Sequence, residues 1–364
     1  MKKIIIKGAY GATNYGDDLL MVIFESFFLK EFENIDLYFE GMYEADYVNK
    51  MLQNSRYITA RTENDWLVYG GGTQFFSYSK KEKIGIFPRI FGLFVKVFKH
   101  PEKLLHKISK PSGHEEKHNS KYIAFLGFGL GPFYRDLKKI NNVTKILGNA
   151  DFLSVRDKVS YEYCQEWGVD SLLGADVAYS SYFTFNIKPK PINEKKRKKI
   201  GLIVRDWVWE ETGRAYIEPL KELYEGTSDF DFQYIVFAPF KDPKWMEDLK
   251  NSNVLCWNPE TDTIDGFLES LNEFDAFVTA RFHGAIIGAL LSKPVICIEI
   301  EPKLRILTED LPELLLWEKP FDLVSLEVLL QRLNYKIDYS ESLGRLRRRA
   351  DRGLSAFKDF FNSK

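Results

Sequence analysis

The stretch that decides the fold runs from residue 275 to residue 298 and reads DAFVTARFHGAIIGALLSKPVICI. Its two apolar ends, residues 275–280 and 294–298, are typical of buried parallel strands, and the small apolar residues between them are typical of a packed helix. Arg281 and His283 therefore fall where a strand ends and a helix begins. In open α/β sheets this edge, at the carboxyl ends of the strands, is where ligands usually bind.

Arg281 and His283 bring complementary chemistry to that edge. An arginine carries a permanent charge and can bind a phosphate or carboxylate through two parallel hydrogen bonds. Backbone amides at the start of the helix also favour an anion. A histidine accepts and donates a proton near neutral pH. The pair predicts an enzyme that acts on an anionic small molecule, and a histidine buried in the core is the alternative for His283.

The rest of the chain repeats the order of strand, glycine-bearing loop and helix, which predicts an α/β fold with parallel, doubly wound sheets. We expect further strands at residues 3–7, 35–40, 65–69, 122–128, 152–155, 200–204 and 232–238. We expect further helices at residues 19–32, 43–53, 158–167, 217–224, 244–249, 265–271 and 341–361.

A change of composition divides this pattern into two halves. Residues 188–199 contain two prolines, a run of Lys and Arg and little apolar character, as expected of a linker. A chain of 364 residues is also too long for one ordinary core. We therefore expect two Rossmann-like domains, residues 1–187 and 200–340, facing each other across a cleft. Residues 341–364 are expected to form a final amphipathic helix rich in arginine.

The composition excludes several classes of protein. Hydrophobic residues make up 45% and charged residues 28%, which are values of a globular protein, and a net charge of −1 gives no general attraction to nucleic acid. Cys164, Cys256 and Cys297 are far apart and form no Cys-x-x-Cys pair, so we expect neither a zinc site nor a disulfide framework. Cysteines that form no disulfide fit a reducing, cytoplasmic location. No apolar run has the length of a signal peptide or a transmembrane helix, so any membrane contact would be peripheral. We expect no metal site at His114 and His118, because they lie in a charged stretch typical of a solvated loop.

The loop after the first expected strand, residues 8–18, is the next candidate. It contains Asn14, Asp17 and Asp18, whose amide and carboxylates suit hydrogen bonds to sugar hydroxyls or the activation of one hydroxyl. The alternative is a turn in which Asp17 or Asp18 caps the following helix. The glycine spacing matches neither a dinucleotide-binding loop nor a P-loop.

A run of glycines ends the expected strand at residues 65–69. Gly71 and Gly72, followed by Thr73, would let a ligand approach the backbone closely, because glycine has no side chain. A tight turn is the alternative for this segment. If the segment faces the cleft, we expect it to contact the same sugar.

Two charged residues end expected strands of the second half. Arg205 follows the strand at residues 200–204 and would face the cleft, where a dianion bound at Arg281 would favour a second cation. An ordinary surface ion pair is the alternative. Glu301 follows the strand after His283 and could hold that imidazole in one tautomer, as carboxylates do in catalytic dyads, or it could be a solvated loop charge.

Four stretches, in this order, resemble the polysaccharide pyruvyl transferase family. They are residues 8–18, which end in NYGDD; residues 69–74, YGGGTQ; residues 154–157, SVRD, with Ser160 and the later GAD at 174–176; and residues 279–303, from TARFHG to EPK. The match spans roughly the whole chain except residues 75–120 and the C-terminal tail. The order of the stretches and the Arg-x-His-Gly element are its most specific features.

The resemblance implies a two-domain fold like that of GT-B glycosyltransferases. It also implies transfer of a pyruvyl group from phosphoenolpyruvate to two hydroxyls of one sugar, giving a cyclic ketal on a cell-surface polysaccharide or its lipid-linked precursor. It implies no cofactor, with phosphoenolpyruvate as a co-substrate. The family's acid/base histidine maps to His283, and the arginines that hold phosphoenolpyruvate map to Arg281 and Arg205.

The same motifs imply that Phe282, Gly284 and Lys303 also contact the donor. Arg156 and Glu301 would support the site. Two other functions are left open. One is a nucleotide-sugar glycosyltransferase of the same fold, in which Glu299 or Glu301 would bind the ribose. The other is a non-catalytic protein that binds a sugar or a lipid, against which the intact Arg281 and His283 argue.

Residues 87–110 mix apolar side chains with basic ones, and Glu102 is the one acidic residue among them. That mixture suits a segment lying on an anionic membrane surface, and a core helix with a solvated basic face is the alternative. The resemblance favours the membrane, since the acceptors of such enzymes are often lipid-linked sugars. We therefore expect the protein in the cytoplasm, with peripheral contact to the inner face of the membrane as a further expectation.

Overall fold

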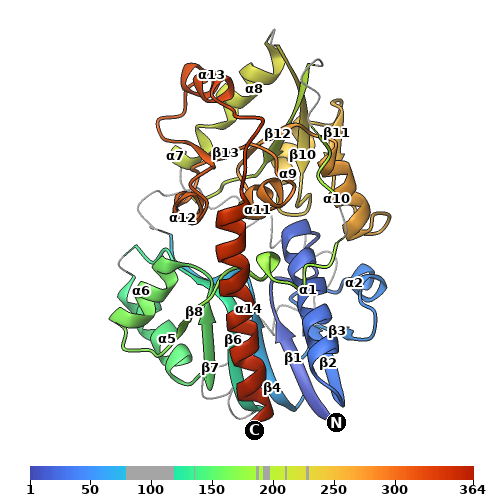
Figure 1. Ribbon diagram of the computed structural model, residues 1–364, viewed down its shortest axis with the longest axis vertical. Coiled ribbons are helices and arrows are strands. Elements are labelled where there is room, and N and C mark those ends of the chain that lie inside the picture. The colour runs from blue at the N-terminus through green and yellow to red at the C-terminus, as the bar shows by residue number, and fades with distance from the viewer. Residues whose placement is uncertain (79–118, 135, 186–187, 192–196, 210, 227–228) are drawn as a thin grey trace, which may run out of the picture.

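A computed structural model of the chain describes residues 1–78, 119–134, 136–185, 188–191, 197–209, 211–226 and 229–364. These residues form two α/β domains that lie one above the other, each built on one parallel sheet (Figure 1). The predicted membrane segment at residues 87–110, together with His114 and His118, lies outside the described residues, as does most of the predicted insertion at residues 75–120.

The first domain contains a parallel sheet with the strand order β3-β2-β1-β4-β6-β7-β8, in which β5 pairs with β6. Its strands are β1 (Lys2–Lys7), β2 (Ile35–Glu40), β3 (Arg56–Ile58), β4 (Asn64–Gly70), β5 (Thr73–Phe75), β6 (Ser120–Leu130), β7 (Phe152–Val155) and β8 (Leu172–Leu173). Its helices are α1 (Tyr15–Glu31), α2 (Asp46–Met51), α5 (Leu137–Gly148), α6 (Lys158–Glu166) and the 3-10 helix η2 (Val177–Tyr179).

The second domain repeats the same plan, with the strand order β11-β10-β9-β12-β13-β14. Its strands are β9 (Lys198–Val204), β10 (Phe230–Val236), β11 (Val254–Cys256), β12 (Ala276–Thr279), β13 (Val295–Ile298) and β14 (Leu315–Trp317). Its helices are α7 (Glu211–Arg214), α8 (Ile217–Glu225), α9 (Pro243–Asp248), α10 (Ile264–Asn272), α11 (Phe282–Leu290), α12 (Pro302–Asp310) and α13 (Leu323–Gln331).

The predicted fold class, two doubly wound α/β domains across a cleft, is confirmed. Every residue of β12 and β13 is buried, as expected for central strands covered by helices on both faces. In each sheet the strand order reverses direction beside the first strand, β1 or β9. This switch point opens a crevice at the carboxyl ends of the strands, where a ligand can bind.

The last helix, α14 (Ser340–Asn362), joins the two domains. In Figure 1 it begins beside the second domain and runs down along the first sheet. In its first half, Arg349 Nη1 lies 2.7 Å from Asp310 Oδ1 at the end of α12. Near its end, Phe357 and Phe361 pack against the ring of Trp66 in β4. The helix therefore belongs to the core of the first domain although it follows the second in sequence.

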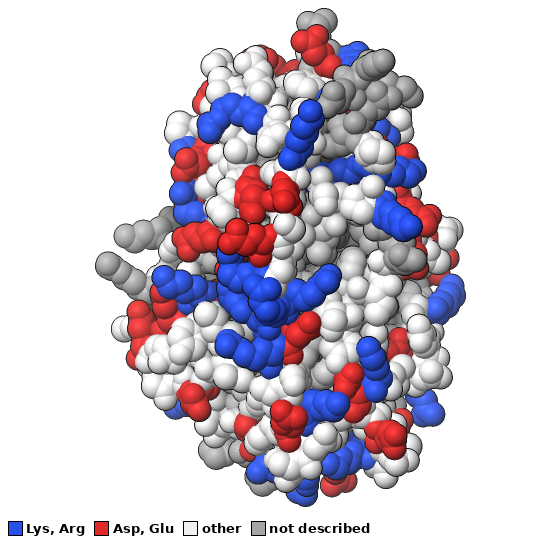
Figure 2. Space-filling model, in the orientation of Figure 1, with Lys and Arg blue, Asp and Glu red and all other residues white. Residues whose placement is uncertain are grey.

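The arginines of α14 give this face of the molecule its main concentration of positive charge (Figure 2). Three of them hold the backbone of neighbouring elements. Arg349 Nε donates to Gly174 O at 2.9 Å, Arg352 Nη2 donates to Leu173 O at 2.8 Å, and Arg345 Nη2 donates to Asp310 O at 2.6 Å. The arginine-rich sequence therefore fixes the segment between β8 and η2.

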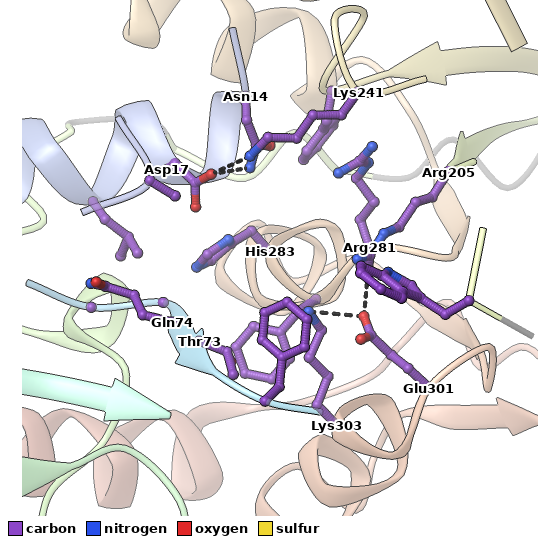
Figure 3. Close-up of a pocket in the computed structure, with 18 of the residues that line it drawn as sticks. Asn14, Asp17, Thr73, Gln74, Arg205, Lys241, Arg281, His283, Glu301 and Lys303 are labelled. Carbon is purple, nitrogen blue, oxygen red and sulfur yellow. Dashed lines mark hydrogen bonds and ion pairs between the residues drawn. The ribbon is translucent and has the colours of Figure 1, made fainter. Parts of the chain in front are cut away.

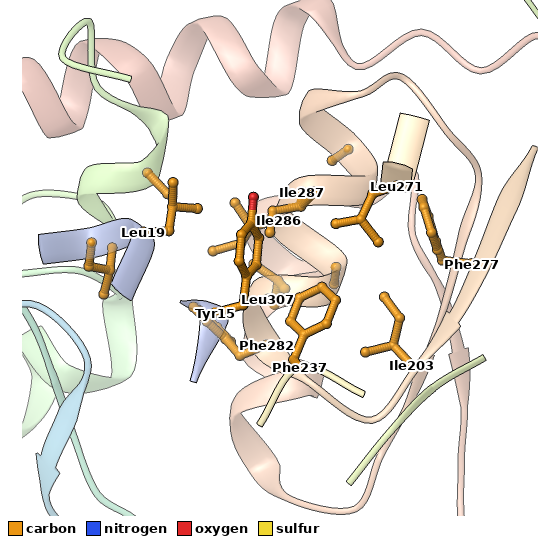
Figure 4. Close-up of a cluster of buried hydrophobic side chains, with 14 of the residues drawn as sticks. Tyr15, Leu19, Ile203, Phe237, Leu271, Phe277, Phe282, Ile286, Ile287 and Leu307 are labelled. Atoms are coloured by element: carbon orange, nitrogen blue, oxygen red, sulfur yellow. The ribbon is translucent and has the colours of Figure 1, made fainter. Parts of the chain in front are cut away.

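Tyr15, at the start of α1, is the centre of the contact between the domains (Figure 4). Its ring lies 5.3 Å from that of Phe237, 5.0 Å from Trp257 and 4.6 Å from Phe267, all in the second domain. Its hydroxyl donates to Ile264 O at 3.0 Å, and its backbone amide donates to Phe237 O at 2.9 Å. A wholly buried aromatic cluster thus fixes the first turn of α1 against the second domain.

The structure also corrects several predicted elements. Helix α5 was not predicted, although Ile140, Val143, Ile146 and Leu147 recur at helical spacing and pack against the core of the first domain. Helix α1 begins at Tyr15 rather than Leu19, so Asp17 and Asp18 lie in its first turn and neither caps it. None of the described helices is both long enough and apolar enough to cross a membrane.

Candidate active site in the cleft between the domains

A cavity of about 420 Å³ lies between the carboxyl edges of the two sheets (Figure 3). Segments that follow β1, β4, β7, β9, β12 and β13 all contribute to its walls. Twelve of the residues predicted for the site line it: Asn14, Asp17, Gly71, Gly72, Thr73, Arg156, Arg205, Arg281, Phe282, His283, Glu301 and Lys303. The volume suits a small anionic molecule together with part of a sugar.

His283 lies in the first turn of α11, in the middle of the view in Figure 3, with Asp17 on one side and Glu301 on the other. Its side chain is 12% exposed, and Nε2 lies 3.6 Å from Asp176 Oδ2 of the first domain. On its other side, a Cβ added to Gly16 would lie 2.3 Å from His283 Nδ1. Glycine at position 16 therefore allows α1 to approach the imidazole closely.

Asp176 is the carboxylate that faces His283, and the predicted partner Glu301 was the wrong choice. Asp176 is buried at the start of η2, where it accepts hydrogen bonds from Ala178 N at 3.1 Å and from Arg156 Nη1 at 3.3 Å. Burial alone would raise its pKa, but His283 and Arg156 outweigh burial and lower it. The Gly-Ala-Asp motif at residues 174–176 was the sequence signal for this residue.

Arg281 is the N-cap residue of α11, and its guanidinium is fixed by two partners. Nε donates to Val204 O at 3.3 Å, and Nη2 pairs with the carboxylate of Asp242, which is completely buried. The side chain is 9% exposed and lines the cavity. A guanidinium fixed in this way presents its remaining donors to the cavity without further loss of side-chain entropy, beside the helix amides that favour an anion.

Glu301 is shared by two cations. It pairs with Arg205, its Oε1 lies 2.8 Å from Lys303 Nζ, and its Oε2 accepts a hydrogen bond from Tyr78 OH at 2.7 Å. Burial opposes the charge of Glu301, but Arg205 and Lys303 lower its pKa to about 2. Burial also lowers the pKa of Lys303 to about 8, against the attraction of Glu301. Two cations around one carboxylate leave this part of the cavity positive.

Asn14, Asp17 and Lys241 form a third group, at the top of Figure 3. Asn14 Nδ2 donates to Asp17 Oδ2 at 2.5 Å, and Lys241 Nζ of the second domain lies 3.0 Å from the same oxygen. Burial would raise the pKa of Asp17, but Lys241 and His283 lower it overall. Asp17 is thus a charged acceptor that faces the cavity and links the domains.

Gly71, Gly72 and Thr73 form the floor on the side of the first domain. Gly71 and Gly72 have φ angles of +63° and +68°, which glycine adopts without strain. A Cβ at Gly72 would meet nothing within 4 Å, so this backbone is open to a ligand. Thr73 Oγ1 accepts a hydrogen bond from Arg156 Nη2 at 2.8 Å, which connects the floor to Asp176 through Arg156.

Two predicted site residues do not line the cavity. Asp18 is completely buried and accepts hydrogen bonds from Trp257 Nε1 at 2.9 Å and Tyr47 OH at 3.2 Å. Burial raises its pKa to about 7. The backbone of Gly284 packs against β12, where a Cβ would lie 2.4 Å from Thr279 Oγ1. Both residues stabilise the walls of the site instead of facing a ligand.

The sequence did not single out several residues that line the cavity: Phe76, Tyr78, Trp209, Lys241 and Asp242. Lys241 and Asp242 follow β10, so the rule that ligands bind at strand ends could have identified them. Their stretch carries no motif, however. Among the described residues, no three His, Cys, Asp or Glu side chains gather as ligands for a metal ion.

Comparison with known proteins agrees with this architecture. A family model described as polysaccharide pyruvyl transferase matches residues 14–302. No curated protein sequence matches the chain. Among solved structures, UDP-GlcNAc 2-epimerase from Neisseria meningitidis, bound to UDP-GlcNAc, is similar with a TM-score of 0.55 and 11% identity over 100% of both chains.

Two further structures resemble the chain to the same degree. The MnaA protein of S. aureus, solved with UDP, has a TM-score of 0.54 and 10% identity over 100% of this chain and 97% of its own. UDP-GlcNAc 2-epimerase from Methanocaldococcus jannaschii has a TM-score of 0.53 and 12% identity over 95% and 98%. At these identities the likeness shows the shared GT-B fold and no more.

Proposed function

We propose that this chain, which belongs to the polysaccharide pyruvyl transferase family, transfers the pyruvyl group of phosphoenolpyruvate to two hydroxyls of one sugar. The product would be a cyclic ketal on a cell-surface polysaccharide or on its lipid-linked precursor. No cofactor is needed beyond phosphoenolpyruvate as co-substrate. One observation carries the proposal: a positive cluster and a histidine backed by a carboxylate share one cavity.

The charge of the cavity fits that of the donor. Phosphoenolpyruvate carries a phosphate and a carboxylate on the same carbon. Arg205 and Lys303 share a single carboxylate, and Arg281 presents a fixed guanidinium beside the start of α11. Charge-assisted hydrogen bonds from these groups would hold the donor in one orientation.

The reaction then needs a proton at the methylene carbon of the donor. Protonation of this carbon turns it into a methyl group and leaves a cationic centre at the neighbouring carbon, which the first sugar hydroxyl attacks. The second hydroxyl displaces phosphate and closes the ring. One hydroxyl proton ends on the methyl group and the other on phosphate, so the atoms balance. His283, held against Asp176, is the group we assign to proton transfer.

The sugar would enter from the side of the first domain. Asn14 and Asp17 offer an amide and a charged carboxylate, and the open backbone at Gly72 leaves room for a ring. A sugar hydroxyl bound to Asp17 would lie on the face of the cavity next to His283, whose charge acts on Asp17.

The direct test is a turnover assay with mass spectrometry. The purified protein is incubated with phosphoenolpyruvate and a panel of lipid-linked and model sugars, and both phosphate release and acceptor mass are measured. The proposal predicts equal amounts of phosphate and of acceptor that has gained a pyruvyl ketal. His283→Gln is the control for background hydrolysis. In a parallel incubation with nucleotide sugars in place of phosphoenolpyruvate, a gain of a hexosyl group by the acceptor would identify a glycosyltransferase and reject the proposal.

A lipid-linked acceptor would place the enzyme at the inner face of the membrane, and the basic, apolar composition of residues 87–110 supports such contact. Replacing Lys96, Lys99, Lys103 and Lys107 together by Glu should abolish co-sedimentation with anionic liposomes. Activity on a water-soluble acceptor should be unchanged. Unaltered sedimentation of the variant would remove this segment from the proposal.

A further inference from the structure

A group of aromatic rings from both domains lies at one side of the cavity. We use the term aromatic platform for Phe76, Tyr78 and Trp209, which all line the cavity. The rings of Tyr78 and Trp209 are stacked, with centroids 5.3 Å apart and an interplanar angle of 26°. The ring of Phe76 meets that of Trp209 edge-on at 5.9 Å. Buried Trp207 supports the platform with its ring 5.1 Å from that of Tyr78.

Trp209 is unusually exposed for a ring held by two neighbours. It is 43% exposed, and the adjacent Val208, which also lines the cavity, is 47% exposed. Tyr78 covers one face of the indole, so much of the exposed area belongs to the other face. Keeping a large apolar surface in water is unfavourable, and a ring already fixed by its neighbours loses little entropy when a ligand covers it. These properties are those of a preformed contact surface.

The platform is joined directly to the donor end of the cavity. The hydroxyl of Tyr78 donates a hydrogen bond to Glu301, the carboxylate shared by Arg205 and Lys303. A ligand on the platform would therefore lie beside these charged groups. Its edge would meet hydrogen-bonding side chains and its flat side would meet the rings.

We propose that the aromatic platform stacks against the apolar face of one pyranose ring of the acceptor, an inference that rests on the proposed function. A pyranose combines an apolar face of C–H groups with a rim of hydroxyls, which matches aromatic rings bordered by Asp206, Arg205 and Glu301. A lipid chain would fit the rings but not this polar border. Stacking fixes the plane of the sugar and so presents two hydroxyls of one ring to the donor.

Octyl β-D-galactopyranoside is a suitable probe, because one face of galactose carries a continuous set of C–H groups and its octyl chain reports on lipid binding. Saturation-transfer NMR should show the strongest transfer to the ring protons of the sugar. Trp209→Ala should weaken sugar binding roughly two- to tenfold, the range for one aromatic contact. Trp209→Phe should keep part of the affinity. Phe240→Ala, which removes an exposed aromatic residue outside the cavity lining, should change nothing.

The outcomes separate this inference from the proposed function. Transfer mainly to the octyl protons would assign the platform to a lipid chain and overturn the inference. So would unchanged sugar affinity in both Trp209 variants, with phosphoenolpyruvate still binding and ketal still forming. A third outcome is that phosphoenolpyruvate does not stabilise the wild-type protein in a thermal shift assay while the sugar signal still depends on Trp209. That result would support the sugar site and reject the proposed pyruvyl transfer.

Discussion

His283 Nε2 and Asp176 Oδ2 lie 3.6 Å apart, and they belong to different domains of the protein. Asp176 is fixed at the start of η2, and the arginines of α14 hold the backbone two and three residues before it. The orientation of the histidine therefore depends on the relative position of the two domains. Any motion that opened the cleft would separate the imidazole from its carboxylate.

His283→Gln should remove nearly all turnover, by roughly 10²–10⁴-fold, because glutamine cannot transfer a proton. The binding of phosphoenolpyruvate should be largely unchanged, since the cations that we assign to the donor remain. Product formation and a phosphoenolpyruvate titration on the same sample check both parts. A variant that turns over at a rate close to that of the wild type would reject the assignment.

Asp176→Asn tests whether Asp176 acts through His283. The amide keeps the size of the side chain but loses the charge that faces the imidazole, so turnover should fall while the KM for the donor changes little. In the double variant with His283→Gln, the second substitution should cause almost no additional loss, because residues that act as a unit are not additive. Independent, multiplying losses would show that Asp176 has only a structural role.

Arg205→Ala should weaken the binding of phosphoenolpyruvate by about 1.5–3 kcal/mol, because one charge-assisted contact is lost. The binding of the sugar should change much less. Glu301 keeps Lys303 as a partner, so the melting temperature should change little. Arg281→Ala should weaken donor binding by a similar amount. It should also lower the melting temperature, because the buried carboxylate of Asp242 loses its arginine partner. Arg305→Ala is the matched control, since Arg305 pairs with Glu299 and Glu318 on the surface. A sugar titration that changes while the donor titration does not would show that the donor site is misplaced.

Asp17→Asn should impair use of the sugar and spare binding of phosphoenolpyruvate. Asp17 faces the cavity and accepts from Asn14 and Lys241, and the N-cap residue of α1 is Asn14. A capping role for Asp17 would have cost about 1 kcal/mol of stability without a specific effect on the sugar. Acceptor kinetics and the melting temperature of this one variant distinguish the two roles.

Asp18 should make the stability of the protein fall as the pH rises from about 4 to about 7. Its pKa is raised from 3.8 to about 7 by burial, so in this window the folded state holds a proton that the unfolded state has released. The free energy of unfolding should decrease across the window by at most about 4 kcal/mol. Asp18→Asn should remove this decrease while keeping an acceptor for Trp257 Nε1. Chemical denaturation between pH 4 and pH 8 measures it. Asp17→Asn serves as a contrast. Because the pKa of Asp17 is lowered in the folded state, its carboxylate contributes stability that is lost as the pH falls, the opposite of Asp18.

The sequence predicted the fold where apolar runs were continuous, as in β12 and β13, and it placed Arg281, His283, Arg205 and Glu301 at the edge of a sheet correctly. It could not show which strand ends meet across two domains, so Asp176 was missed as the neighbour of His283. Asp17 and Asp18 show a second reason why the sequence alone could not predict the whole site. Adjacent residues on a helix point about 100° apart, and only the packing of Tyr15 on the second domain shows that Asp17 faces the cavity and Asp18 faces Trp257.

The course of α14 has a consequence for the synthesis of the protein. Phe357 and Phe361 complete the core around Trp66, yet they are translated after the whole second domain. The first domain cannot complete its packing while the ribosome is still translating the second, although domains commonly fold in the order in which they emerge. Residues 1–185 expressed alone should therefore expose the side of the sheet that α14 covers and aggregate. A peptide of residues 340–364 supplied in trans should restore their solubility.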